Sequence, residues 1–73
     1  MTAIDTRRRS LTVNGTPVRA VAATLAALVA EQGFAGVKVA TALNGTFVPE
    51  RLRAETPLAD GDRIEILSAR QGG

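Results

Sequence analysis

The sequence predicts an α+β domain in which a small mixed β-sheet clasps one main helix. Two Asn-Gly dipeptides, Asn14-Gly15 and Asn44-Gly45, separate short runs of strand-forming residues and predict β-hairpins. The segment from Thr24 to Gln32 has the apolar spacing of an amphipathic helix. The resulting order of strand, strand, helix, strand, short strand and strand is typical of an α+β domain.

The length of the chain, 73 residues, makes it one domain with a small core. A domain of this size buries only about 60% of its unfolded surface, so it does not easily enclose a substrate pocket. Residues 1–9 show no hydrophobic periodicity and are expected to form a flexible N-terminal arm. We expect residues 10–68 to form the domain and residues 69–73 to form a flexible, functional C-terminal tail.

The composition excludes several classes of site. The chain has no Cys and no His, which excludes disulfides, thiolate nucleophiles, His bases and Cys/His metal sites, and we expect no metal. Nine cationic residues nearly balance seven anionic ones. The cluster Arg7-Arg8-Arg9 has no Tyr or Trp to help it stack on bases, so a solvated arm is favoured over nucleic-acid binding. The weakly polar run Val18–Ala30 is too short to span a membrane, and a cytoplasmic protein is expected.

The first half of the chain predicts a hairpin and then the helix. Leu11 and Val13 alternate with polar residues and form the first strand, and residues 17–20 form the return strand. Pro17 lacks an N–H, so it belongs at the first position of a strand or on an unpaired edge. Leu25, Leu28 and Val29 form one apolar helical stripe, which begins at Thr24 and ends before a left-handed Gly33.

The second half predicts three more strands. Residues 37–43 are weakly polar throughout, which favours a central or doubly buried strand, and residues 46–48 form a short strand that Pro49 ends. Residues 50–55 are expected to form a surface or helical turn, and Asp60-Gly61-Asp62 a tight turn. The last strand, residues 63–67, places Ile64 and Ile66 on one face, where they meet Leu25 and Leu28 in the core.

The C-terminus ends in Gly72-Gly73, directly after the last predicted strand and the short connection through Arg70 and Gln71. Two Gly residues have no Cβ atoms, so this part of the chain fits a channel too narrow for side chains. The carboxylate of Gly73 lies at its end. The tail therefore suggests that the protein presents its terminal carboxylate to a partner enzyme, which modifies it.

Six motifs follow one another along the chain: Val13-Asn14-Gly15, Leu43-Asn44-Gly45, Val48-Pro49, Ala54-Glu55-Thr56-Pro57-Leu58, Asp60-Gly61-Asp62-Arg63-Ile64-Glu65-Ile66 and Gly72-Gly73. By the order and spacing of these motifs, the chain resembles the sulfur carrier protein of thiamine biosynthesis from about Leu11 to its end. Two features depart from the family pattern. Glu50 and Arg53 stand where the family often has Arg and Trp, and Arg70 and Gln71 stand where apolar residues often precede the Gly pair.

The resemblance implies a ubiquitin-like β-grasp fold and a carrier rather than an enzyme. It implies that an activating enzyme uses ATP to adenylate Gly73 and converts it to a thiocarboxylate. Its sulfur then goes to the synthase that builds the thiazole ring. Gly72, Gln71 and Arg70 are expected to thread into the partner, and no cofactor is expected to bind stably to the chain itself, which has no phosphate-binding loop.

A docking surface is expected on the sheet face opposite the helix. Phe47, Val48 and Leu67 are candidates for an exposed apolar patch there, with a place in the core as the alternative for Phe47. Two other functions stay open from the residues alone. One is the sulfur-donating small subunit of molybdopterin synthase, or a related ubiquitin-like carrier, which shares the fold and the Gly-Gly end. The other is a non-catalytic module that binds nucleic acid or an acidic partner through Arg7-Arg8-Arg9.

Overall fold

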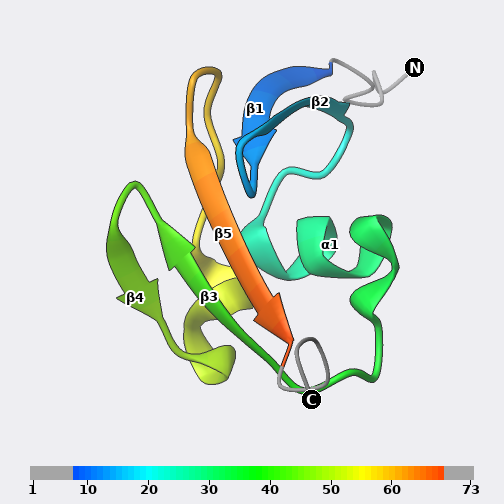
Figure 1. The fold of residues 1–73 in the computed structure, drawn as a ribbon, viewed down its shortest axis with the longest axis vertical. Helices are drawn as coiled ribbons and strands as arrows, with labels where there is room; N and C mark the ends of the chain where they lie inside the picture. Colours follow the sequence, from blue (N-terminus) through cyan, green and yellow to red (C-terminus); the bar gives the residue numbers. More distant parts are fainter. Residues whose placement is uncertain (1–7, 69–73) are drawn as a thin grey trace, which may run out of the picture.

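The structure, a computed structural model, describes residues 8–68, so the predicted tail and most of the predicted arm lie outside the described residues. Five strands form one sheet in the order β2-β1-β5-β3-β4 (Figure 1). The elements in chain order are β1 (Arg9–Val13), β2 (Thr16–Ala20), α1 (Leu25–Val29), the π-helix η1 (Ala30–Phe34), β3 (Val39–Leu43), β4 (Thr46–Val48), the 3₁₀-helix η2 (Glu50–Glu55) and β5 (Arg63–Ser68). This is the small mixed sheet with one main helix that the sequence predicts.

The last strand, β5, lies in the middle of the sheet. It runs parallel to β1, with Val13 opposite Ile64, and antiparallel to β3, with Val39 opposite Ser68. The predicted side-by-side arrangement of the first and last strands is therefore confirmed. β2 and β4 are the two edge strands, and β2 contains Pro17, whose missing N–H suits an edge.

Both predicted hairpins are present, and their turns have the predicted backbone conformation. Asn14 and Gly15 have φ angles of 51° and 82°, and Asn44 and Gly45 have φ angles of 51° and 87°. Positive φ at both central residues is the requirement of the type I′ turn, which Asn-Gly meets with little strain. The turns join β1 to β2 and β3 to β4.

The helix begins where the sequence predicts and changes form near its end. The Thr24 hydroxyl accepts a hydrogen bond from the Ala27 N–H at 3.2 Å, which caps α1. Regular α-helix ends at Val29, earlier than predicted, and the chain continues as the wider η1 turn. Gly33 in this turn has φ 92°, the left-handed conformation expected of it. Val37 still donates to the Phe34 carbonyl at 2.9 Å, so β3 begins only at Val39.

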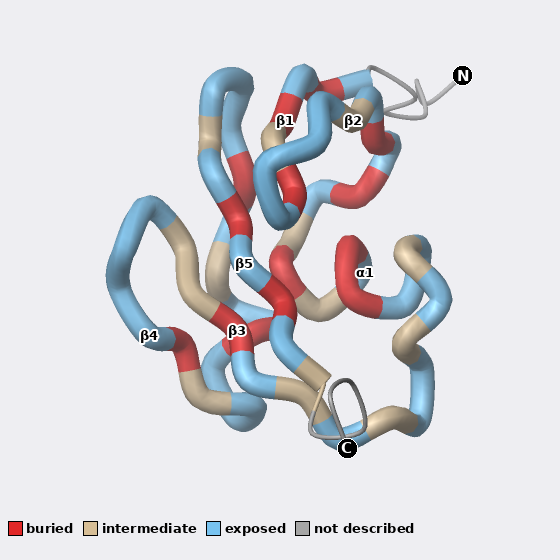
Figure 2. Tube along the Cα trace, in the orientation of Figure 1, coloured by how far each residue is buried: buried red, intermediate tan, exposed pale blue. Residues whose placement is uncertain are grey.

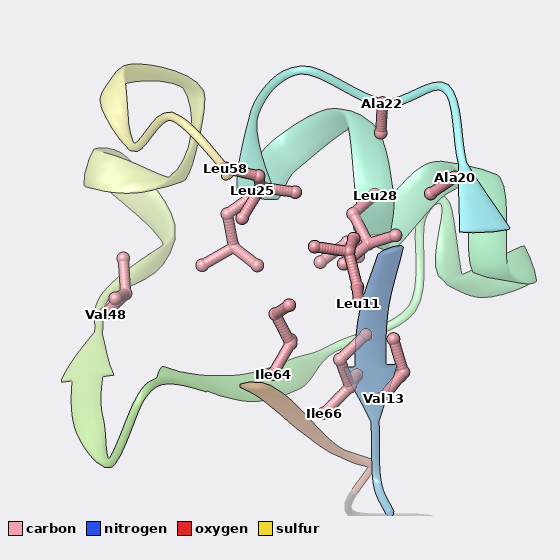
Figure 3. Close-up of a cluster of buried hydrophobic side chains, with 11 residues drawn as sticks. Leu11, Val13, Ala20, Ala22, Leu25, Leu28, Val48, Leu58, Ile64 and Ile66 are labelled. Atoms are coloured by element: carbon pink, nitrogen blue, oxygen red, sulfur yellow. The ribbon is translucent and has the colours of Figure 1, made fainter. Parts of the chain in front are cut away.

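The core lies between α1 and the inner face of the sheet. Leu25 and Leu28 of the helix and Ile64 and Ile66 of β5 have no exposed surface, and they belong to one cluster (Figure 3). The predicted four-residue core is confirmed. Along β5, buried and exposed residues alternate, so the opposite face of this strand points to solvent (Figure 2).

Arg9 corrects the predicted limit of the arm. The sequence places it in the flexible segment, but it is the first residue of β1 and only 6% exposed. Its Nη1 donates to the carbonyl oxygens of Val21 at 3.3 Å and Ala22 at 3.4 Å. A long aliphatic stem allows Arg to lie in the fold while its guanidinium meets backbone acceptors. Arg9 is therefore part of the domain and does not extend an exposed basic cluster, whereas Arg8 is exposed.

Candidate functional site

The proposed site is the chain that follows β5. Its residues Arg70, Gln71, Gly72 and Gly73 lie outside the described residues, and their roles stay predictions. The structure does show what precedes them. β5 has a neighbouring strand on each side (Figure 1). Its last residue, Ser68, is paired in register with Val39 of β3. The tail therefore continues from the central strand of the sheet.

The outer face of the sheet has an apolar patch next to the end of β5. Phe47 of β4 and Leu67 of β5 are each 65% exposed, and contiguous exposed apolar side chains are typical of interaction sites. Ala40 and Ala42 of β3 lie between them, because Ala40 is opposite Leu67 and Ala42 is opposite Phe47. We call these four residues the outer patch.

The two small Ala side chains leave the middle of the outer patch hollow. A depression of about 290 Å³ is lined by Ala40, Thr41, Ala42, Phe47, Glu65 and Leu67. A second depression, of about 350 Å³, shares Ala40 and Leu67 and reaches Ser68. Leu67 therefore lies between two depressions, one of which extends to Ser68, the last residue of β5. This shape suits an apolar side chain of a partner protein.

Val48 is a correction to the predicted patch. It is 8% exposed and belongs to the core cluster (Figure 3). Successive side chains of a strand point to opposite faces, so Phe47 and Val48 cannot both lie on the outer face. Exposure places Phe47 outside the core and therefore decides between the two expectations for that residue. Ala40 and Ala42, which are absent from the predicted patch, take the place of Val48, and the same alternation along β3 indicates them.

The acidic residues of the 59–62 turn serve the backbone. Asp60 Oδ1 accepts from the Ser10 N–H at 2.8 Å, and Asp62 Oδ2 accepts from the Ala59 N–H at 2.8 Å. Within residues 8–68, no group of three or more His, Cys, Asp or Glu side chains has the arrangement of a metal site. These carboxylates therefore act as turn and strand-end acceptors. Over the same residues, no helix is long and apolar enough to cross a membrane.

Arg53, one of the departures from the family pattern, is buried and fastens η2 to the sheet. It is 8% exposed, and its Nε donates to Thr41 Oγ1 at 3.0 Å while its Nη2 donates to the Val39 carbonyl at 2.6 Å. Thr41 passes the interaction on by donating to the Val48 carbonyl at 2.7 Å. One arginine thus links η2, β3 and, through Thr41, the end of β4.

We expect Arg53→Met to lower the free energy of unfolding by about 1–3 kcal/mol, because the partly buried Val39 carbonyl and the buried Thr41 hydroxyl lose their charged donor. Arg51→Met is the matched control, since Arg51 is exposed on the same 3₁₀-helix, and its effect is expected to stay within about 0.5 kcal/mol. Urea unfolding curves measure both. Equal midpoints for the two variants would show that the Arg53 network contributes nothing to stability.

Comparison with known proteins agrees with this architecture. The model of the ThiS family matches residues 11–73. A crystal structure of the thiamine biosynthesis protein ThiS from Geobacter metallireducens is similar, with a TM-score of 0.69 and 30% sequence identity over 88% of this chain and 99% of that chain. A search of curated proteins found no match.

The similarity confirms the predicted ubiquitin-like β-grasp fold, in which a mixed sheet clasps one helix. The family match also covers the parts of the chain on which the site depends. It begins within β1 and includes both Asn-Gly turns, all of β5 and the terminal Gly72-Gly73. The chain belongs to the ThiS family of sulfur carrier proteins.

Proposed function

We propose that the chain carries sulfur for thiazole ring formation in thiamine biosynthesis as a thiocarboxylate on Gly73. The observation that carries this proposal is the family match, which extends to the last residue of the chain. The position of β5 supports it, because the strand that leads to Gly73 is the central one and has a neighbour on both sides. In this proposal the chain is a co-substrate of its partners, in the cytoplasm, rather than a catalyst.

The chemistry follows from the reactivity of a carboxylate. A carboxylate is anionic and resonance-stabilised, so it resists attack by nucleophiles. In the proposed first step, an oxygen of the Gly73 carboxylate attacks the α-phosphorus of ATP, and pyrophosphate leaves. In the second step, hydrosulfide or an equivalent sulfur nucleophile attacks the acyl carbon, AMP leaves, and a proton is released from sulfur. ATP binds to the partner in this scheme, and the chain contributes the group that is activated.

The outer patch is proposed as the surface that the partners recognise. Leu67 is six residues before Gly73, and an extended chain spans about 3.5 Å per residue. The reactive carboxylate therefore lies within roughly 20 Å of the patch along the chain. A partner that holds the patch can accept the whole tail in an adjoining channel. We propose this arrangement for the adenylating enzyme and for the thiazole synthase.

The test of the proposed function is mass spectrometry of the intact chain. The chain is incubated with ATP, sulfide and the activating enzyme of a thiamine pathway, and the expected product has one oxygen of the Gly73 carboxylate replaced by sulfur. Reaction without ATP is the control, in which no change is expected. A chain that stays unmodified in the complete reaction would rule out the proposed function.

The outer patch gives a separate prediction. Phe47→Ala should raise the KM of the activating enzyme for the chain by about 5–30-fold, since losing an apolar anchor at an interface costs about 1–2 kcal/mol. The unfolding midpoint should hardly change, because Phe47 is 65% exposed. Leu52→Ala is the control, an exposed apolar residue outside the outer patch. If both variants keep the wild-type KM, the partner does not use this patch.

A further inference from the structure

The two Asn-Gly turns hold the two ends of β5 with their side chains. At the start of the strand, Asn44 Oδ1 accepts from the Arg63 N–H at 2.9 Å, and Asn44 Nδ2 donates to Asp62 Oδ1 at 3.0 Å. Near its other end, Asn14 Oδ1 accepts from the Ile66 N–H at 2.8 Å, and Asn14 Nδ2 donates to the Ile66 carbonyl at 3.0 Å. The turns are alike in sequence and conformation, yet they act at opposite ends of one strand.

The Asn14 side chain bonds to β5 beyond the point where the backbone pairing with β1 ends. Backbone pairing between β1 and β5 covers only Thr12 with Arg63 and Val13 with Ile64. Asn14 adds one backbone bond, from its N–H to the Ile64 carbonyl at 2.9 Å, and the chain then turns away into β2. β5 continues to Ser68. A carboxamide has the same donor and acceptor as a peptide group, so the Asn14 side chain extends the β1 ladder by one more residue.

Ile66 is a critical place for such a clamp. Its side chain is completely buried, and Asn14 engages both its N–H and its carbonyl. The next residue, Leu67, stands in the outer patch, and Gly73 is seven residues beyond Ile66. On its other side Ile66 is opposite Thr41 of β3, so the Asn14 bonds hold the second side of β5 just before Leu67. Asn44 bonds to Arg63 at the opposite end of β5, so its side chain does not hold the part of the strand next to Leu67.

We propose that Asn14 is a positioning residue, which fixes the end of β5 so that Leu67 and the C-terminal tail reach the activating enzyme in register. This inference rests on the proposed function, because it concerns the same carboxylate. Asn14 does not touch the reacting atoms and acts only through Ile66. A loose strand end would have to be ordered by the partner in each encounter, which lowers the rate of productive binding.

The test compares Asn14→Gly with Asn44→Gly. Glycine accepts the φ of 51° found at both positions, so each substitution removes a carboxamide and leaves the turn intact. Both variants lose two side-chain hydrogen bonds near β5 and should lose similar stability. Only Asn14→Gly should speed hydrogen exchange of the Ile66 amide. The kcat/KM for thiocarboxylate formation should fall by about tenfold in Asn14→Gly and by less than about twofold in Asn44→Gly.

The outcomes separate this inference from the proposed function. If the wild-type chain is not converted, the proposed function fails, while Ile66 exchange in the two variants still tests the clamp. If the wild type is converted and the two glycine variants react at equal rates, the positioning role of Asn14 is wrong and the carrier function stands. Should Asn14→Gly not fold, Asn14→Asp replaces it, since aspartate tolerates the turn and keeps only the acceptor for Ile66. A kcat/KM for Asn14→Asp no lower than that of Asn44→Gly overturns the proposal.

Discussion

Replacing Leu28 by alanine is expected to lower the free energy of unfolding by about 2–5 kcal/mol, the usual cost of opening a cavity at a fully buried leucine. Leu28 has no exposed surface and lies between the helix and the inner face of the sheet, in the same cluster as Ile64 and Ile66 (Figure 3). The expected total stability is small. At roughly 0.05–0.15 kcal/mol per residue, a chain of this length has about 4–11 kcal/mol, so one substitution removes a large share of it.

Urea unfolding followed by circular dichroism measures the effect of Leu28→Ala. Leu52→Ala is the matched control, because Leu52 is 41% exposed and the same change of side chain there leaves no enclosed cavity. Its effect is expected to stay within about 0.5 kcal/mol. An unfolding midpoint for Leu28→Ala as high as that of Leu52→Ala would mean that the helix does not pack on the sheet through this face.

The parts of the fold that depend on residues close together in the sequence could be predicted. The requirement of Asn-Gly for positive φ located both hairpins, and helical spacing located Leu25 and Leu28 on the buried stripe. Alternation along β5 assigned Ile64 and Ile66 to the core. The prediction for Val48 is wrong because β4 has only three residues. So short a strand does not show by its alternation whether Phe47 or Val48 faces the core.

The two buried arginines were beyond the reach of such rules. Arg9 and Arg53 are charged residues in polar stretches of sequence, where a solvated position is the usual outcome. Each is buried because its guanidinium meets backbone carbonyls from another part of the fold, those of Val21 and Ala22 in one case and that of Val39 in the other. Which carbonyls come within reach is a property of the tertiary structure, and no local pattern encodes it.

In the candidate site, too, some features could be predicted from the sequence and others could not. The Gly-Gly end and its proposed chemistry come from sequence and family alone, because those residues lie outside the part of the chain that the structure describes. Phe47 and Leu67 could be named from the sequence, and their exposure is observed. The second role of Asn14 could not be found this way. Its partner, Ile66, lies 52 residues further along the chain, and only the folded sheet brings the two together.

Removing Gly73 is expected to reduce thiocarboxylate formation by at least about 100-fold. The deletion moves the terminal carboxylate back by about 3.5 Å, and a displacement of about 1 Å from the productive geometry is enough for a loss of that size. Gly72→Val is expected to block the reaction as well, because a β-branched side chain does not enter a channel that fits two glycines. Both changes lie beyond Ser68 and should leave the unfolding midpoint at the wild-type value.

The measurement is the same mass spectrometry of the intact chain, with proteolytic mapping to assign the sulfur to one residue. A chain lengthened by one glycine after Gly73 is the matched control for the deletion, because it keeps the Gly-Gly sequence and displaces the carboxylate by the same distance in the other direction. It should react as poorly as the shortened chain, since the partner must meet the carboxylate at a fixed distance from the outer patch. Equal modification of the shortened chain and the wild type, or sulfur on any residue other than Gly73, would contradict the carrier mechanism.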